Sequence, residues 1–341
     1  MKIEKIIIRL DAGGKFGLGH LSRCISLINE FKCNINEFII KTDNQQLVED
    51  YIKNNLSVAF KLMSIDQSIS QSEEIDVISS HYTSNTLLIV DHYSAVEDYQ
   101  KQLFDKKIKW LQLDSHAKIN FYANWVMHGS PGATDSLYEP LRKNANTKFL
   151  LGPKYCIIKE QLRNRHQERR VRTKLQNVIV CFGGGNDKGA TLACLKALDF
   201  ERFQNIEFTV AMSQFNPDYT EILKLQDRGR IHVINPSNLL ETMIQSDLAL
   251  ITPGMISYES AFLGLPMLLV TIADNQAINA KAWGETKCGL NIGSVFDVSK
   301  NLNKNLSSLE QNLEILPKMS QNCLSLVDGK GVSRIVNEIM N

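Results

Sequence analysis

The chain has 341 residues, with 38 Lys and Arg against 37 Asp and Glu, and a formal net charge of +1. This balance creates no global field that would attract a polyanion, so the composition disfavours nucleic acid as a partner. Because 341 residues exceed the roughly 250–300 at which a single hydrophobic core stops growing, we expect two domains.

The sequence also disfavours a membrane protein and a protein stabilised by disulfides. Residues 1–10 carry four charged side chains around one short apolar run, and no apolar stretch of about 18 residues follows. We therefore expect no signal peptide, no membrane insertion and a cytoplasmic location. The seven cysteines are odd in number, scattered and without a C-x-x-C pair, which is typical of small core residues rather than disulfides or a zinc site.

Short apolar runs recur between helical patterns along the whole chain. They are apolar throughout rather than at every second residue, which is typical of parallel strands buried on both faces. We therefore predict an α/β chain of two doubly wound, Rossmann-like domains. The expected strands lie at residues 6–8, 38–40, 87–90 and 110–113, and then at 178–182, 207–210, 231–234, 248–251 and 267–270.

The domain boundary is expected after residues 151–153 and before the arginine-rich stretch 163–174. That stretch lacks an aromatic residue to stack a base, so we interpret it as a solvated helix or linker. We assign residues 1–155 to the first domain and 156–341 to the second. Residues 299–308 are expected to form a loop, and residues 316–340 one or two amphipathic helices broken at 328–331.

The first candidate for chemistry is the glycine loop that follows the first strand. Gly17, Gly19 and His20 come just before the helical pattern of residues 21–31. The glycines permit a close approach to a ligand, and the helix N-terminus favours a neutral imidazole that can act as a general base. The spacing does not fit G-x-G-x-x-G, which excludes a dinucleotide loop. His20 as a helix cap or packing residue is the alternative.

Two turns in the second half resemble anion sites. Residues 182–187 are glycine-rich but lack the Gly-Lys-[Ser/Thr] ending of a P-loop, so ATP cleavage is disfavoured. Residues 250–261 form a strand, a turn and a helix start, where amides near Gly254 could hold a diphosphate and Glu259 a ribose diol. Residues 274–280 open a further helix whose amides could reach phosphate or sugar hydroxyls, although Asp274 as a plain cap is equally consistent.

Other titratable candidates are Asp91, His92 and Tyr93 at the end of a predicted strand, and His116 and His128. Roles in turn hydrogen bonding are as consistent as roles in a cleft. No H-x-x-x-H or carboxylate cluster indicates a metal site, and no G-x-S-x-G indicates a serine nucleophile.

Together these motifs resemble the metal-independent UDP-sugar hydrolase family of pseudaminic acid biosynthesis, which removes UDP from UDP-2,4-diacetamido-2,4,6-trideoxy-β-L-altropyranose. That family is similar to the glycosyltransferase that makes lipid II and shares its GT-B architecture, in which two Rossmann-like domains face each other across a cleft. The matching stretches are residues 9–11, 17–20 with Arg23, 89–93, 152–155, 182–184, 252–261 and 275–276.

The resemblance implies that His20 activates water, which attacks the anomeric carbon with inversion while UDP leaves, and that no cofactor is needed. Tyr93 and Asp11 would complete the catalytic group. The implied substrate-binding residues are Gly17, Gly19, Arg23, Lys159, Gly183, Gly184, Pro236, Leu239, Gly254, Met255, Ile256, Glu259, Asn275 and Gln276, with residues 236–239 against uracil.

The chain departs from the family at three places. Residues 12–14 are Ala-Gly-Gly where serines are expected, Lys159 replaces an arginine, and residues 114–132 follow a different pattern. Lysine cannot reproduce a bidentate grip on phosphate or carbonyl. We therefore expect a hydrolase of a UDP-activated amino or deoxy sugar, in nonulosonic acid or surface polysaccharide synthesis, and the three departures leave the identity of the sugar open. The alternatives are a GT-B glycosyltransferase and a non-catalytic sugar-nucleotide sensor.

Overall fold

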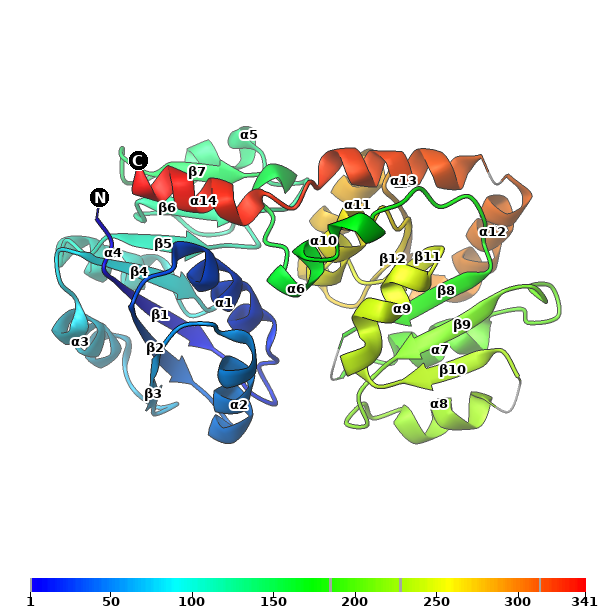
Figure 1. Ribbon diagram of the computed structural model, residues 1–341, viewed down its shortest axis with the longest axis horizontal. Helices are drawn as coiled ribbons and strands as arrows, with labels where there is room; N and C mark the ends of the chain where they lie inside the picture. Colours follow the sequence, from blue (N-terminus) through cyan, green and yellow to red (C-terminus); the bar gives the residue numbers. More distant parts are fainter. Residues whose placement is uncertain (1, 184–185, 227–228, 313) are drawn as a thin grey trace. The chain divides into compact units, whose positions relative to one another are not determined.

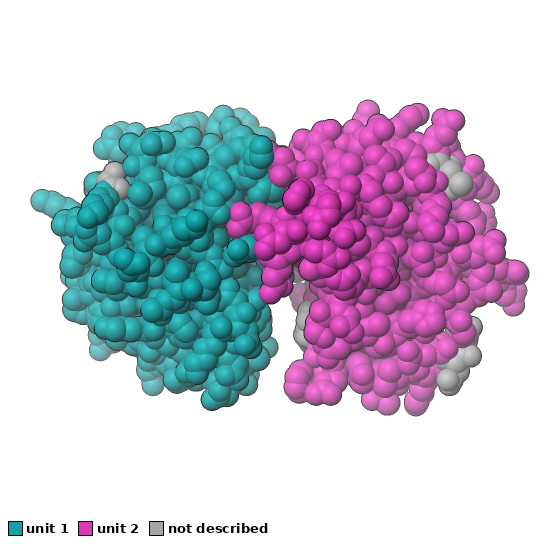
Figure 2. Space-filling model, viewed as in Figure 1, with its two compact units in different colours: residues 1–160, 329–341 teal, residues 161–328 magenta. Residues whose placement is uncertain are grey.

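The computed structural model describes residues 2–183, 186–226, 229–312 and 314–341, apart from the side chain of Asn275 (Figure 1). The chain forms two compact units, Met1–Glu160 with Gly329–Asn341, and Gln161–Asp328 (Figure 2). The chain therefore crosses into the second unit once and returns once.

The first unit is built on a parallel sheet of seven strands in the order β3-β2-β1-β4-β5-β6-β7. Alternate residues of the central strand β1 enter two separate cores, because Ile6 and Ile8 pack with helix α1 whereas Ile7 packs with α3 and α4. Both faces are thus covered. The strands are β1 (Lys5–Asp11), β2 (Ile35–Lys41), β3 (Lys61–Ile65), β4 (Thr86–Asp91), β5 (Trp110–Leu113), β6 (Trp125–His128) and β7 (Lys148–Leu151).

Helices of the first unit follow its strands. Helix α1 buries Leu21, Ile25 and Ile28 at helical spacing and ends where Lys32 takes the left-handed conformation, with φ 56°. The helices are α1 (Gly19–Phe31), α2 (Gln45–Asn55), α3 (Gln71–His81), α4 (Glu97–Asp105), α5 (Asp135–Tyr138) and α14 (Gly331–Met340).

The second unit has a parallel sheet of six strands in the order β10-β9-β8-β11-β12-β13. They are β8 (Asn177–Cys181), β9 (Glu207–Ala211), β10 (Ile231–Ile234), β11 (Leu248–Ile251), β12 (Met267–Thr271) and β13 (Gly289–Ser294). The helices are α7 (Ala190–Ala197), α8 (Tyr219–Leu225), α9 (Leu239–Gln245), α10 (Met255–Phe262), α11 (Ala277–Glu285), α12 (Val298–Gln311) and α13 (Ile315–Leu326); α6 (Glu160–Arg163) crosses the boundary.

Every strand expected from an apolar run is present, and both sheets are doubly wound, as predicted. Three expectations need correction. Residues 299–308 are not a loop but lie within α12, whose Leu302, Leu306 and Leu309 are buried. The tail is two helices as expected, but α14 belongs to the first unit, where Val332 and Ile335 join the core beside α1 (Figure 1). Finally, the units divide after Glu160 rather than after residue 155.

The arginine-rich stretch is not simply a solvated linker. Arg172 is fully buried, and its guanidinium donates hydrogen bonds to the carbonyls of Ser246 at 2.9 Å and Leu263 at 3.0 Å. Arg169 donates to the carbonyl of Phe262 at 2.8 Å. These carbonyls lie at helix C-termini, where backbone acceptors lack intrahelical partners. Among the helices of the described residues, none is long and apolar enough to cross a membrane.

Candidate active site

The glycine loop leads from strand β1 into helix α1 at the point where the strand order of the first sheet reverses. Strands β1 and β4 are neighbours there, although β1 is followed in sequence by β2. In doubly wound sheets a ligand binds beyond the carboxyl ends of the strands at such a reversal. The topology therefore places the end of β4, at Asp91, beside the start of α1, at His20.

The loop closes on itself before the helix begins. The amide of Gly17 donates to the carbonyl of Gly13 at 2.8 Å, and the amide of Gly13 donates back at 3.2 Å. Gly17 has φ 75°, in the left-handed region that favours glycine. Gly19 starts α1, and the preceding Leu18 provides no side-chain cap, so the first amides of the helix are left to other partners.

His20 and Arg23 converge on the buried carboxylate of Asp91. Their spacing of three residues places both on one face of α1. His20 Nδ1 lies 2.7 Å from Asp91 Oδ1, and Arg23 Nε donates to Asp91 Oδ2 at 2.5 Å. Burial alone would raise the pKa of the Asp91 carboxyl, but the Arg23 guanidinium and the His20 imidazole hold it well below its usual range. Asp91 is thus an ionised carboxylate that orients the imidazole.

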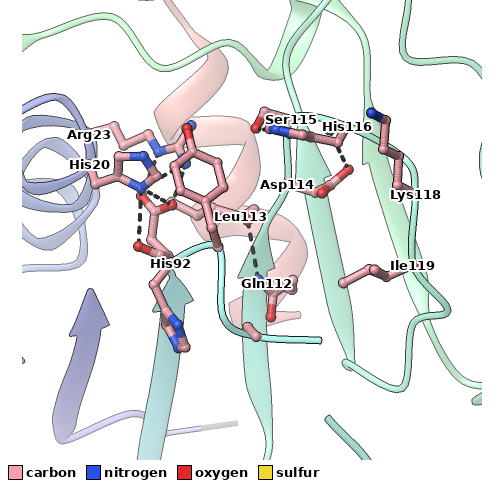
Figure 3. Close-up of a pocket in the computed structure, with 13 residues that line it drawn as sticks. His20, Arg23, His92, Gln112, Leu113, Asp114, Ser115, His116, Lys118 and Ile119 are labelled. Atoms are coloured by element: carbon pink, nitrogen blue, oxygen red, sulfur yellow. Dashed lines mark hydrogen bonds and ion pairs between the residues drawn. The ribbon is translucent and has the colours of Figure 1, made fainter. Parts of the chain in front are cut away.

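A pocket of the first unit opens in front of this cluster, with a volume of about 110 Å³. Tyr93, which is 69% exposed, lies between two imidazoles, with ring centroids 5.1 Å from His20 and 5.4 Å from His116. Figure 3 shows His20 and Arg23 on one side of the pocket and Ser115, His116 and Lys118 on the other. Among the described residues, no group of three or more His, Cys, Asp or Glu side chains could hold a metal ion.

Asp11 does not line this pocket. Its carboxylate accepts a hydrogen bond at 2.7 Å from Nη1 of Arg9, a fully buried residue. Arg9 also donates to Glu74 at 2.8 Å, and Tyr99 donates to the same carboxylate at 2.7 Å. The structure therefore places Asp11 in a buried charge network at the end of β1.

His92 borders that network and gives the protein a testable acid sensitivity. Burial lowers the pKa of His92 from 6.5 to about 3. Between these values the unfolded chain takes up a proton that the folded chain does not, so stability falls as pH falls from about 6.5. Replacing His92 by phenylalanine should make the free energy of unfolding less dependent on pH, by up to one proton, as measured by urea unfolding.

The useful range for that measurement lies between about pH 6.5 and 4.5. Below it, Glu74 contributes as well. Burial would raise the pKa of the Glu74 carboxyl, but the hydrogen bond and charge of Arg9, with smaller contributions from His92 and Tyr99, lower it from 4.5 to about 2. The stabilising effect of Glu74 is therefore lost as pH falls from about 4.5 to about 2. His166, which is exposed, provides the control. An equal pH dependence in His92→Phe and wild type would contradict the burial argument.

The residues expected to bind a nucleotide gather at the carboxyl ends of strands in the second unit. Gly183 follows β8 and Gly254 follows β11, and these two strands are neighbours where the strand order of the second sheet reverses. Gly183 has φ 118°; Gly184 lies outside the described residues. Gly254 precedes α10 without a side-chain cap, which leaves the amides of Met255 and Ile256 at an open helix N-terminus.

The other residues predicted in the second unit lie around the same edge. Glu259 is buried on α10. Gln276 follows β12, the next strand, and its Oε1 accepts from the amide of Ile272 at 2.9 Å. The backbone of Asn275 lies in the same short 3-10 helix. Pro236 and Leu239 follow β10, two strands from β8. Lys159, half-buried near the end of the first unit, does not line the pocket around His20.

The structure thus brings His20, Arg23 and Tyr93 together and leaves Asp11 and Lys159 outside their pocket. Among the residues named only as general candidates, Asp91 and His116 have prominent places in it. Asp91 could have been recognised because it ends a predicted strand, where ligands of doubly wound sheets bind. The position of His116 carries no such signal, because it lies on a loop.

Known proteins show two levels of similarity to the chain. No protein-family model matches it. An uncharacterized protein of Methanocaldococcus jannaschii is 28% identical over 277 residues, 78% of this chain and 55% of that protein, so the chain spans about half the length of this relative. The spore coat polysaccharide biosynthesis protein SpsG of Bacillus subtilis is 20% identical over 331 residues, covering 95% of this chain and 94% of that protein.

Solved structures are similar over nearly the whole chain. A UDP-N-acetylglucosamine 2-epimerase superposes with TM-score 0.67 and 14% identity, covering 100% of this chain and 96% of that one. S. aureus MnaA with UDP superposes with TM-score 0.64 and 13% identity, covering 99% of this chain and 96% of that one. Acinetobacter baumannii MurG superposes with TM-score 0.65 and 13% identity, covering 98% of this chain and 99% of that one. The chain has a GT-B-like fold. Within that fold, the His20 pocket belongs to the N-terminal unit and the Gly254 turn to the C-terminal unit.

Proposed function

We propose that the protein hydrolyses a UDP-activated amino or deoxy sugar to the free sugar and UDP, without a metal. The observation that carries the proposal is the His20–Asp91 pair, at 2.7 Å, on the wall of a pocket beside an exposed tyrosine. A histidine whose one nitrogen is held by a buried carboxylate is the arrangement that general bases use.

The pair supports one sequence of proton and bond changes. Asp91 accepts the Nδ1 proton of the neutral His20 ring, which leaves the lone pair on Nε2. Nε2 takes a proton from water as the water oxygen attacks the anomeric carbon. The bond from that carbon to the UDP oxygen breaks, UDP leaves with the electron pair, and the anomeric configuration inverts. Asp91 then stabilises the imidazolium until its proton returns to solvent.

The nucleotide end of the substrate is assigned to the second unit. The open amides at Met255 and Ile256, together with Gly183, suit a diphosphate because helix N-termini favour anions. Glu259 would accept hydrogen bonds from the ribose diol, and residues 236–239 would contact uracil. In support, S. aureus MnaA, which has the same fold, is described with UDP. SpsG, a protein of polysaccharide biosynthesis, supports a role in surface polysaccharide or nonulosonic acid synthesis.

A glycosyltransferase reaction is the second candidate, because the fold is shared with MurG. His20 would then take its proton from an acceptor hydroxyl rather than from water. In both reactions an oxygen attacks the anomeric carbon and UDP leaves. Only the hydrolase releases UDP when no acceptor is present, so an acceptor-free assay separates the two reactions.

The test is to incubate the purified protein with a panel of UDP-sugars, with and without EDTA, and to follow UDP release and the anomeric configuration of the product by NMR. Hydrolysis predicts UDP release without acceptor, insensitivity to EDTA and inverted sugar. UDP release only after an acceptor is added would favour the transferase. Conversion to another UDP-sugar without UDP release would favour an epimerase reaction.

A further inference from the structure

We propose that residues 114–119 form a preformed recognition loop for the sugar, with His116 donating a hydrogen bond to a sugar oxygen. This inference rests on the proposed function in one respect, that a sugar occupies the pocket beside His20. It assigns a binding role to residues that have no counterpart in the motifs from which the function was proposed.

The loop is held from within by one carboxylate. Asp114 Oδ2 accepts hydrogen bonds from the amides of His116, at 3.1 Å, and Ala117, at 2.8 Å. Ala117 has φ 51°, in the left-handed region that a residue with a Cβ rarely adopts without compensation. The hydrogen bond from the Ala117 amide to Asp114 provides that compensation, so the carboxylate determines where the His116 ring lies.

A buried pair holds the carboxylate from behind. Tyr138 of α5, which is fully buried, donates its hydroxyl proton to Asp114 Oδ2 at 2.5 Å. Nδ1 of His128, at the end of β6, lies 2.6 Å from the same phenol oxygen. Since that oxygen has already donated its one proton, the histidine must donate to it. Burial lowers the pKa of His128 to about 4, which keeps this ring neutral near pH 7.

The front of the loop presents His116 to the pocket. Ser115 Oγ lies 2.6 Å from His116 Nδ1. In the proposed tautomer the serine hydroxyl donates to Nδ1, so the ring proton lies on Nε2 and His116 is a hydrogen-bond donor. Burial lowers the pKa of His116, so the neutral form prevails near pH 7. His20, by contrast, is set by Asp91 to accept at Nε2.

The two histidines therefore offer opposite chemistry on either side of Tyr93. The acceptor, His20, suits the attacking water. The donor, His116, suits an acceptor oxygen elsewhere on the same sugar ring, whether a hydroxyl or an acyl carbonyl. The exposed ring of Tyr93 between them provides a face for the C–H groups of a pyranose. The recognised group is thus the sugar rather than the nucleotide.

The experiment compares His116→Ala, His116→Gln and Tyr138→Phe with the exposed-histidine control His166→Ala. Titrations with UDP, UDP-glucose and UDP-N-acetylglucosamine are made in the His20→Ala background, in which turnover is not expected. Steady-state kinetics in the wild-type background give KM and kcat. Unfolding curves establish that each variant is folded.

We expect His116→Ala to weaken binding of the better UDP-sugar about tenfold, the loss of one neutral hydrogen bond, while UDP binding stays unchanged. KM should rise with kcat nearly constant. His116→Gln, which keeps an N–H donor, should recover much of the affinity, and Tyr138→Phe should act in the same direction as His116→Ala but less strongly. The His166→Ala control should match the wild type.

Equal weakening of UDP and UDP-sugar, a fall in kcat at constant KM, or no change in His116→Ala would overturn the recognition role. An unchanged Tyr138→Phe would overturn the positioning role. The recognition role would also be overturned if the affinity for both UDP-sugars is no higher than the affinity for UDP. If hydrolysis fails but the His116-dependent gain persists, only the proposed function is lost.

Discussion

The His20→Ala variant is expected to lower kcat for UDP release by about 10²–10⁴-fold, the contribution typical of a general base. KM should change little, because the substrate contacts proposed in the second unit are untouched. The side chain of His20 is 18% exposed at the surface of the pocket, so its removal should leave the fold intact. Initial rates of UDP release without acceptor, measured at saturating substrate, test this expectation.

His81 supplies the matched control for that variant. It also pairs with a carboxylate, Glu37, at 2.7 Å, but does not line the pocket. His81→Ala should keep kcat near the wild-type value. UDP release by His20→Ala at the wild-type rate would refute the assignment of His20 as the base.

The Asp91→Asn variant is expected to reduce kcat by a similar factor through a different cause. Its amide can present an N–H to Nδ1 of His20, which favours the tautomer with the proton on Nε2 and removes the lone pair from the pocket. The change also leaves Arg23 without its anionic partner, so the free energy of unfolding should fall, by up to about 3–5 kcal/mol for loss of one partner of a buried pair. Kinetics and urea unfolding separate the two effects.

Asp76→Asn is the control, because that carboxylate is 67% exposed and pairs with Lys106 at 3.0 Å. It should change neither kcat nor stability appreciably. If Asp91→Asn loses stability but keeps full kcat, Asp91 is a structural partner of Arg23 and does not set the tautomer of His20.

Nine strands of the described residues could be found from local sequence because their apolar runs are continuous. Strand β6 and the edge strands β3, β7 and β13 were not predicted, however. In the exposed edge strand β3, the burial pattern is too weak to separate it from a loop. For residues 299–308 the expected loop was wrong for a related reason: most of their Asn, Ser and Lys side chains are exposed or half-buried, whereas the leucines every three or four residues face the core.

The candidate site likewise contains some residues that local sequence predicts and others that only the tertiary structure brings in. His20 was predictable because a glycine loop between a strand and a helix is a local pattern. Its partner Asp91 is 71 residues away, and only the pairing of β1 with β4 brings the two together. Asp11, next to the glycine loop in sequence, is instead drawn away from the pocket by the buried guanidinium of Arg9.

The amino-acid sequence by itself determined the two doubly wound domains and the glycine loop with its histidine, because both depend on residues that are neighbours in the chain. Only the tertiary structure decided that Asp91 and Arg23 orient that histidine, that Asp114, Tyr138 and His128 hold His116 across from it, and that α14 returns to the first unit. These arrangements depend on which strands become neighbours and which buried charges find partners, and both are settled when the chain packs.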